Sequence, residues 1–336
     1  MNIIRSVDLV SFRCHKKYHL DCNKLTTLIV GENGSGKTSV LEAIYIALQG
    51  KSFRNSDEDI KRRGDEYYKI DVALSDKSRV VVRYMDGKKS FEIDNKKYGR
   101  LPGANKYPVV LFEPDDLHLV GTSPARRRNY FDKLISQIDK NYHSSLIKYE
   151  KALRQRNELL KGGYMSSEQV FCWDVMLARY GSEIVKWRKK IIGEVNKKVG
   201  SVYKNIANNE DNVEIKYITE CGVGEDKYLR GLGSSLERDN MVGHTTFGVH
   251  KDDYKFIFNG VLADGSASRG EVRSIILAMK FIEAEILEDI LQKKPLILLD
   301  DIFSELDEYR QKHLVDNFKE NQIIITSVAI PDVVEV

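Results

Sequence analysis

The sequence predicts an α/β fold with mixed parallel and antiparallel sheets, interrupted by an inserted α-helical arm domain. Two observations predict this fold. Apolar, β-rich runs flank helices near both ends of the chain, at residues 25–30 and 296–299. Between them, apolar residues recur at intervals of three and four, which is typical of helices. Because 336 residues are many for one core, we expect a discontinuous domain of residues 1–128 and 245–336 and an arm of residues 129–244.

The N-terminal part is expected to contain strands around one buried helix. Residues 25–30 form a short strand that Gly31 ends, and residues 38–49 form a helix that Gly50 stops. Residues 79–84 and 90–93 are β-rich and enclose Asp86-Gly87, a hairpin signal, so an antiparallel sheet should join the parallel one. Near the C-terminus we expect a helix at 271–291 and strands at 296–299 and 322–327.

The predicted arm is two helices of about 30 residues each, which turn at Gly162-Gly163 and extend roughly 45–50 Å. Their apolar stripes should seal against each other and leave the basic residues outward. Residues 126–204 hold 18 Lys and Arg against 8 Asp and Glu, in a chain whose net charge is +3. This basic region indicates either a polyanionic partner or a solvated, lysine-rich helical surface, and the composition favours neither.

Composition excludes a membrane span, because the sequence contains no run of 18 uncharged apolar residues. The four cysteines form no CxxC pair and have no histidine at metal-ligand spacing, so we expect reduced thiols and a cytoplasmic protein.

One motif carries specific chemistry. Residues 31–38 fit the pattern GxxxxGK[ST] and lie between a predicted strand and a predicted helix, which is the context the motif requires. A glycine turn without a ligand is the alternative. In the functional interpretation, backbone amides converge on the phosphates of ATP, Lys37 pairs with the β- and γ-phosphates, and Thr38 ligates Mg²⁺. The expected nucleotide-binding residues are Gly31, Glu32, Asn33, Gly34, Ser35, Gly36, Lys37 and Thr38.

A second motif supplies the acidic groups that ATP hydrolysis needs. The apolar strand 296–299 runs into Asp300 and Asp301. We expect Asp300 to hold Mg²⁺ and Asp301 to orient the attacking water or accept its proton. An apolar strand that ends in two aspartates is common by itself. It becomes evidence for ATP hydrolysis because the same chain also contains the phosphate loop.

Two further segments complete the set. Ser268-Arg-Gly270-Glu271 precedes the helix 271–291, and Ser304-Glu-Leu-Asp307 follows the acidic strand. Ser268 alone could be a helix cap. In this order the four elements resemble those of ABC-type ATPases with a P-loop head. That resemblance implies a composite site, in which Ser268 and Gly270 of a second subunit complete catalysis together with Lys37 and Asp301.

Spacing narrows the resemblance further. Lys37 and Ser268 are 231 residues apart. Transporter nucleotide-binding domains place these motifs closer, SMC and Rad50 proteins insert hundreds of heptad residues, and a small-molecule P-loop kinase has no use for the Ser268 and Ser304 segments. The intermediate insert resembles that of the RecF family. The residues that carry the match are Ser11-Phe-Arg13, Gly50-Lys-Ser-Phe-Arg54, Phe112-Glu-Pro-Asp-Asp-Leu117, Gly121-Thr-Ser-Pro124, Arg126-Arg-Arg-Asn-Tyr-Phe-Asp132 and Gly248-Val-His-Lys-Asp-Asp253.

The RecF resemblance implies an ATP-dependent homodimer that clamps double-stranded, gapped or single-stranded DNA without sequence specificity. It also implies slow hydrolysis, a place in recombinational repair, replication and the SOS response, a nucleoid location, and RecR, RecO and RecA as partners. Arg54 would reach the γ-phosphate, and a surface salt bridge is the alternative. The residues expected to contact DNA phosphates are Arg126, Arg127, Arg128, Lys189 and Lys190. For the three arginines, the solvent face of a helix start is the alternative.

The sequence departs from the family pattern at several positions. Glu271 stands where the family has Gln, and Val249 and Lys251 replace Pro and Arg beside His250. No glutamate follows Asp300, and the shorter Asp301 agrees with slow hydrolysis. His250 is expected to be a hydrogen-bonded structural residue rather than a catalytic or metal-binding one.

Overall fold

The computed structural model describes residues 3–22, 24–54 and 56–333. Its contacts divide the chain into two compact units, one of Met1–Leu117 with Glu283–Val336 and one of His118–Ile282. The structure thus has a discontinuous unit interrupted by an insertion. The units change at residues 117/118 and 282/283, whereas the sequence places the borders at 128/129 and 244/245. The assignment of head and arm as functional domains stays a prediction.

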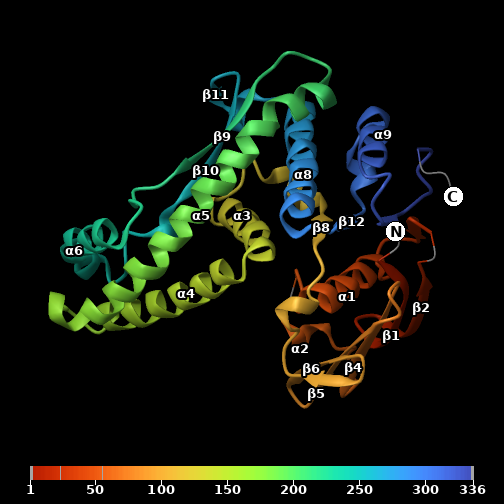
Figure 1. Cartoon of the computed structure of the whole chain (residues 1–336), viewed down its shortest axis with the longest axis horizontal. Coiled ribbons are helices and arrows are strands. Elements are labelled where there is room, and N and C mark those ends of the chain that lie inside the picture. The colour runs from red at the N-terminus through yellow and green to blue at the C-terminus, as the bar shows by residue number, and fades with distance from the viewer. Residues whose placement is uncertain (1–2, 23, 55, 334–336) are drawn as a thin grey trace. The chain divides into compact units, whose positions relative to one another are not determined.

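The first unit contains two sheets of opposite type (Figure 1). The antiparallel sheet has the order β2-β1-β4-β5-β6-β7. Its strands are β1 (Ile4–Phe12), β2 (His15–Asp21), β4 (Tyr67–Leu74), β5 (Arg79–Met85), β6 (Lys88–Ile93) and β7 (Lys96–Tyr98). The predicted hairpin is confirmed, because Asp86 and Gly87 both have positive φ angles between the paired residues Met85 and Lys88.

The other sheet of this unit is parallel, with the order β3-β13-β12-β8. Its strands are β3 (Thr26–Val30), β8 (Val109–Phe112), β12 (Leu296–Asp300) and β13 (Ile323–Ser327). All residues of β8, β12 and β13 are buried, as a sheet covered on both faces requires. Because the strands are parallel, the ends of β3 and β12 open at the same edge, which brings residues 31–36 and Asp301 to one side.

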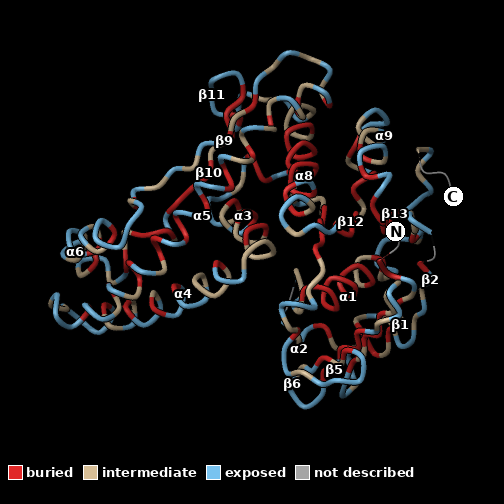
Figure 2. Tube along the Cα trace, in the orientation of Figure 1, coloured by how far each residue is buried: buried red, intermediate tan, exposed pale blue. Residues whose placement is uncertain are grey.

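Helix α1 (Lys37–Gln49) contacts strands of both sheets, including β1 and β4 of one and β12 and β13 of the other. It is therefore buried around most of its circumference, and Figure 2 shows it almost entirely in the colour of buried residues. Gly50 ends α1 in the left-handed conformation, with φ 86°. The predictions for this helix and its stop are confirmed. The unit also contains α2 (Asp57–Ile60), α9 (Glu308–Asn317) and the 3₁₀ turns η1 (Gly103–Asn105) and η4 (Ile302–Glu305).

The side chain of Gln322 joins the first strand to the last. Its Oε1 accepts from the backbone N–H groups of Ile3 and Ile4, at 2.7 and 2.8 Å. Its Nε2 donates to the carbonyls of Ile4 and Cys22, at 2.8 and 3.1 Å. These four bonds tie the start of β1 and the end of β2 to the residue before β13.

The second unit is built on long helices with a small antiparallel sheet. Figure 1 shows α4 running alongside α5, with α6 beside the far end of the pair. The helices are α3 (Pro124–Ile138), α4 (Lys140–Lys161), α5 (Ser167–Ala207), α6 (Glu225–Val242) and α7 (Ala263–Ser266), with the turn η3 (Val249–Lys251). The sheet has the order β11-β10-β9, with β9 (Val213–Ile218), β10 (Asp253–Phe258) and β11 (Val261–Leu262). The turn η2 (Pro114–His118) and α8 (Arg269–Leu291) each contain residues of both units.

The turn at Gly162-Gly163 is confirmed, but the prediction of two 30-residue helices is wrong. The first breaks at Asp139, whose carboxylate accepts from the Tyr142 N–H at 2.6 Å and so starts α4 as a separate helix. The second, α5, has 41 residues, or about 60 Å at the usual rise. The sequence interpretation also missed β9, which lies inside the expected all-helical segment and pairs with β10.

The expectation that the basic residues of the arm face outward is wrong for Arg156 and Arg188, and Arg127, just before the predicted start of the arm, is buried as well. Arg156, Arg188 and Arg127 are 0%, 2% and 5% exposed. Each is held by aspartates from other segments, because a buried guanidinium is tolerated only when carboxylates pair with it. These pairs are Arg156 with Asp174 and Asp239, Arg188 with Asp132 and Asp252, and Arg127 with Asp253.

Within the described part of the chain, no helix combines the length and apolar character needed to cross a membrane. The four cysteines are free thiols, and Cys22 and Cys221 are buried.

Candidate nucleotide-binding site

The loop between β3 and α1 has the backbone conformation that its glycines predict. Gly34 and Gly36 have φ angles of 83° and 97°, in the left-handed region that other residues avoid. Gly36 is also the N-cap of α1. A β-carbon on Gly36 would lie 2.5 Å from Nε2 of His15 and still closer to Sγ of Cys14. The loop therefore exposes its backbone at the positive end of a helix, where anions bind.

Lys37 is the first residue of α1 and is 8% exposed. Its ammonium donates to the carbonyls of Gly31 and Glu32, at 2.7 and 3.0 Å. The side chain thus lies across the loop that carries it, with its charge inside the turn. The four loop residues from Glu32 to Ser35, which precede Gly36 and Lys37, are exposed.

Thr38 and Asp300 meet, although 262 residues separate them in the sequence. The Thr38 hydroxyl donates to Oδ1 of Asp300 at 2.8 Å, and the Thr326 hydroxyl donates to the same oxygen at 2.9 Å. Burial raises the pKa of Asp300 above its ordinary value, while these two hydroxyls and the charge of Arg54 act in the opposite direction. The structure therefore brings together the hydroxyl and the carboxylate that the two motifs were expected to contribute.

Asp301 follows in a left-handed conformation, with φ 50° and ψ 26°. Its backbone N–H donates to both the carbonyl and the hydroxyl of Thr326, at 3.1 and 3.0 Å, which fixes the residue at the end of β12. Among the described residues, no hydrogen-bond partner meets its buried Oδ1. A buried carboxylate oxygen without a partner is costly in a folded protein, and such groups gather at functional sites.

Arg54 is exposed, and its backbone N–H donates to the Ser52 hydroxyl at 2.9 Å. Its positive charge lowers the pKa of Asp300, in opposition to the larger raising effect of burial. Arg54 therefore acts electrostatically on the candidate site, and its proposed contact with a phosphate stays a prediction.

The segment from Ser268 to Glu271 begins α8 with a reciprocal cap. The Ser268 hydroxyl accepts from the Glu271 N–H at 3.3 Å, and the Glu271 carboxylate accepts from the Ser268 N–H at 2.6 Å. This is a capping box, which favours Glu or Gln at the third helical position. The cap function that the sequence left open is thus present. Ser268 is exposed and Gly270 is partly exposed, so both are accessible.

The segment after the acidic strand is ordered by its own polar groups. The Ser304 hydroxyl donates to the Asp301 carbonyl at 2.8 Å, and the Asp307 carboxylate caps α9 by accepting from the Arg310 N–H at 3.0 Å. The segment Ser304-Glu-Leu-Asp307 therefore forms an ordered turn, and the Ser304 hydroxyl fixes the backbone of Asp301.

His250 has a structural environment. Its Nδ1 is 2.9 Å from the Tyr149 hydroxyl and its Nε2 is 3.0 Å from the Thr245 carbonyl. Burial lowers the pKa of His250 to about 4. The two aspartates that follow it pair with Arg188 and Arg127. The motif around His250 thus holds the second unit together, in agreement with the structural interpretation.

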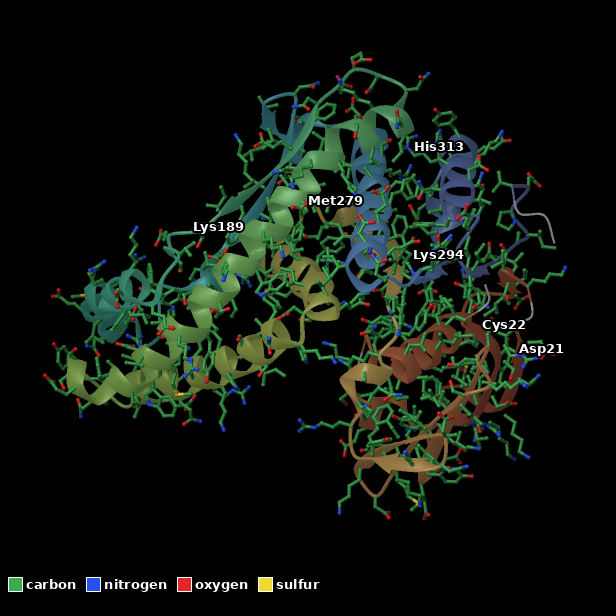
Figure 3. The ribbon with its side chains drawn as sticks, viewed as in Figure 1. Asp21, Cys22, Lys189, Met279, Lys294 and His313 are labelled. Carbon is green, nitrogen blue, oxygen red and sulfur yellow. The ribbon has the colours of Figure 1, made fainter. Side chains whose placement is uncertain are left out.

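The candidate DNA-contacting residues differ in accessibility. Lys189 and Lys190 are exposed on α5, where Figure 3 labels Lys189, and Lys190 lies over the Trp187 ring at 4.6 Å. Arg126 is partly exposed. Arg128 is partly exposed and donates to the Asp252 carbonyl at 2.6 Å. Arg127 does not lie on a solvent face, the alternative left open for it, because its guanidinium is buried against Asp253. Its contact with DNA stays a prediction.

Sequence reasoning missed a supporting network around α1. Arg13 makes a two-pronged bond to the buried Glu42, at 2.9 and 2.8 Å, and the Ser52 hydroxyl donates to the same carboxylate. His15 Nε2 is 3.1 Å from the Gly36 carbonyl. The turn after β1 is therefore bonded to the phosphate loop and its helix. The position of Arg13 in a matching motif was the available signal, but nothing in the sequence pointed to Glu42 as its partner.

Comparisons with known proteins agree with this geometry. A family model described as an AAA domain matches residues 6–322. The DNA replication and repair protein RecF of Clostridium novyi (strain NT) is 32% identical over 341 residues, which cover 99% of this chain and 94% of the relative. The RecF of Clostridioides difficile (strain 630) is 33% identical over 342 residues, covering 97% and 92%.

Solved structures give the same result. A structure of the recombination mediator protein RecF-ATPrS in the RecFOR pathway aligns with a TM-score of 0.91 at 31% identity, covering 99% of this chain and 94% of the other. The Smc head domain of Pyrococcus furiosus, with an extended coiled coil, aligns over 99% of this chain and 91% of its own at 18% identity, with a TM-score of 0.52, and shows the fold alone. The predicted fold class, an ABC-type ATPase head with an inserted helical segment, is confirmed. On full-length similarity in both sequence and structure, the chain belongs to the RecF family of DNA replication and repair proteins.

Proposed function

We propose that this chain is an ATP-dependent DNA-binding protein of recombinational repair and replication, in which bound ATP closes a dimer around DNA. One observation carries the proposal. The Thr38 hydroxyl and the Asp300 carboxylate, from two distant motifs, meet at 2.8 Å at the open edge of the parallel sheet. A chain that used residues 31–38 only as a turn would not need this acidic partner. A solved RecF-ATP relative, 30% identical, supports ATP as the ligand.

The residues at this edge fit a magnesium ion as well as a nucleotide. Thr38 and Asp300 offer oxygen atoms, the ligands that Mg²⁺ prefers. The described residues contain no cluster of three or more His, Cys, Asp and Glu side chains placed to hold a metal. Phosphate oxygens and water would supply the other ligands, as is usual for Mg²⁺. When bound, the ion would be held by Thr38 and Asp300 and would offset the negative charge of the phosphates.

Side chains of the protein would bind the phosphates and orient the attacking water. Lys37 would exchange the carbonyls of Gly31 and Glu32 for phosphate oxygens, keeping its charge within the loop. Asp301 would orient the attacking water, because its Oδ1 is buried and its backbone is fixed by Thr326. Its short side chain and fixed backbone limit how well it can follow the reacting water, so hydrolysis would be slow.

A second copy of the chain would complete each site. The Ser268 hydroxyl accepts from the Glu271 N–H and so keeps its own proton to donate to a γ-phosphate oxygen. The Glu271 carboxylate is bonded back to the Ser268 N–H, which reduces its repulsion of a phosphate. Gly270 beside it would let the backbone approach closely. Because both copies contact the γ-phosphate only when assembled, ATP would stabilise the dimer by mass action.

DNA would be held mainly through its phosphates, by exposed basic residues such as Lys189 and Lys190. Binding of this kind is salt-dependent and reads little sequence. Family membership, and the RecFOR pathway named for a solved relative, support RecR, RecO and RecA as partners and a cytoplasmic, nucleoid-associated location.

Sedimentation with ATP, with and without gapped DNA, tests the proposal. The native chain should dimerise with ATP, whereas Lys37→Met and Ser268→Arg should stay monomeric. Ser234→Arg, which places the same charge at an exposed site on α6, should dimerise normally. A Ser268→Arg variant that still forms the ATP-dependent dimer would refute the composite site. A native chain that gains no affinity for DNA with ATP would refute the proposed function.

A further inference from the structure

A hollow of about 360 Å³ lies in the second unit. Three segments line it: the end of β9, the C-terminal turns of α6 with the residues that follow, and η3. Its lining contains Arg238, His244 and Lys251, together with the acids Glu220 and Asp252. The hollow is therefore a concave surface on which two cations, Arg238 and Lys251, converge from separate elements.

The cations of this hollow are not neutralised by the protein. Arg238 and Lys251 are exposed, and no ion pair is recorded for either within the described residues. The nearby acids are engaged elsewhere. Asp252 pairs with Arg188 at 2.8 Å and accepts from the Tyr217 hydroxyl.

Asp239 of α6, like Asp252, is already paired with other groups of the protein. It is fully buried, pairs with Arg156 at 2.6 Å, and accepts from the backbone and hydroxyl of Thr246 at 2.8 and 2.6 Å. Glu220 is the remaining acid in the lining. Two permanent positive charges thus face one acid in the hollow, an arrangement that favours an external anion.

A second hollow adjoins the first. It has a volume of about 280 Å³, lies along α4, and shares His244 with the first hollow. Its lining contains Arg154 and Lys161 together with Glu150 and Glu158. Lys161 pairs with Glu158 at 2.8 Å, whereas Arg154 is exposed and has no ion pair in the described part of the chain. Two hollows with one common wall, each carrying an unpaired arginine, suit an anion that repeats along a chain better than a single free anion.

We propose that these two adjoining hollows bind successive backbone phosphates of a nucleic acid, with Arg238 and Lys251 holding one and Arg154 the next. This inference rests on the DNA binding of the proposed function and gives it a location. Residues 126–204, which include α4 and most of α5, hold 15 Lys and Arg besides the three buried arginines, against 8 Asp and Glu. This excess favours a long polyanion over a short acidic peptide. His244 lies between the two phosphates and separates the hollows.

The test compares two double variants of equal charge. Arg238→Gln/Lys251→Gln removes the cations of the first hollow. Lys227→Gln/Arg230→Gln removes two exposed cations of α6 that line neither hollow. All four positions are exposed, so thermal unfolding of both variants should match the native chain. Affinity for a gapped duplex is measured with ATP at several salt concentrations.

We expect the first variant to bind at least about tenfold more weakly than the control, with a salt slope reduced by about 1. The control should change affinity by less than about threefold, since it alters only the general field. Adding Arg154→Gln should lower the slope by about 1 again. Equal losses in both double variants would overturn the inference and leave the proposed function intact. A native chain that does not bind the duplex would overturn the proposed function itself.

Two competing ligands identify the anion. Inorganic phosphate, titrated at constant ionic strength, should bind no tighter than the millimolar range. Sub-millimolar binding that Arg238→Gln/Lys251→Gln abolishes, with duplex affinity unchanged, would assign the hollow to free phosphate and overturn the inference. Polyglutamate should displace the duplex less effectively than an unlabelled duplex of the same charge, and the opposite order would assign the surface to an acidic protein.

Discussion

Replacing Arg156 with alanine should destabilise the second unit by about 4 kcal/mol. Arg156 is fully buried on α4. Its Nε donates to Asp174 of α5 at 2.6 Å, and its Nη1 donates to Asp239 of α6 at 2.6 Å and to the Thr245 hydroxyl at 2.8 Å. One side chain therefore joins three helices, and its removal leaves two buried carboxylates without their cation.

The expected magnitude follows from what each carboxylate retains. Breaking one buried ion pair from one side costs about 3–5 kcal/mol. The two losses do not add, because Asp239 still accepts from the backbone and hydroxyl of Thr246. Burial already raises the pKa of Asp174, so without Arg156 this carboxyl can take up a proton instead of remaining charged. The total loss of stability in Arg156→Ala should thus be close to the cost of breaking a single buried ion pair.

Chemical denaturation measures this loss, and hydrogen exchange in α4, α5 and α6 locates it. Loss of Arg156 would raise the folded pKa of Asp174 further above its unfolded value. The variant should therefore regain stability relative to the native chain as the pH falls from 7 towards 4. The control is Arg154→Ala, an exposed arginine two residues away, which should change stability by less than about 0.5 kcal/mol. An Arg156→Ala loss below about 1 kcal/mol, or one no larger than that of the control, would refute this account.

Three other substitutions test the site and its support. Gly36→Ala should weaken ATP binding at least about tenfold in calorimetry, because left-handed strain of about 1–2 kcal/mol adds to a clash with His15; a native affinity would contradict the assigned loop geometry. Asp300→Asn keeps an oxygen for the hydroxyls of Thr38 and Thr326 but removes a buried charge. Its melting temperature without nucleotide should equal or exceed the native value, while Mg²⁺-dependent hydrolysis should fall about 100-fold or more. Burial lowers the pKa of His250 to about 4, below its ordinary value, so its contribution to stability is complete above pH 6.5 and declines as the pH falls towards 4. His250→Asn should remove up to about 1.4 kcal/mol of this decline per pH unit, measured by denaturation between pH 6.5 and 4.5; an unchanged pH profile would show that His250 is not the titrating group.

The nucleotide site could be predicted from sequence because its parts are local. The loop, the start of α1 and the acidic strand each follow from a few adjacent residues, and parallel strands necessarily end at one edge. The contact between Thr38 and Asp300 is a direct consequence of that edge. The bond between Arg13 and Glu42 was not predictable, because it depends on how the turn after β1 folds onto α1.

The second unit was harder to predict because its organisation depends on distant pairs. Helical periodicity places an apolar stripe on a helix, but it does not show which arginine turns inward. Arg127 and Arg188 are buried because Asp253 and Asp252, more than 60 residues away in each case, come to meet them. Strand β9 alternates over only six residues and is stable as a strand because β10 pairs with it along its whole length.

The order of the parallel sheet has a consequence for the synthesis of the protein on the ribosome. Strand β3, which leads into the phosphate loop, is an edge strand whose sheet neighbour is β13, near the end of the chain. The side chain of Gln322 also holds the start of β1. The phosphate loop therefore cannot gain its native support until residues 322–327 have left the ribosome. The continuous segment 118–282 is synthesised before residues 322–327, so it can fold before the nucleotide site is complete.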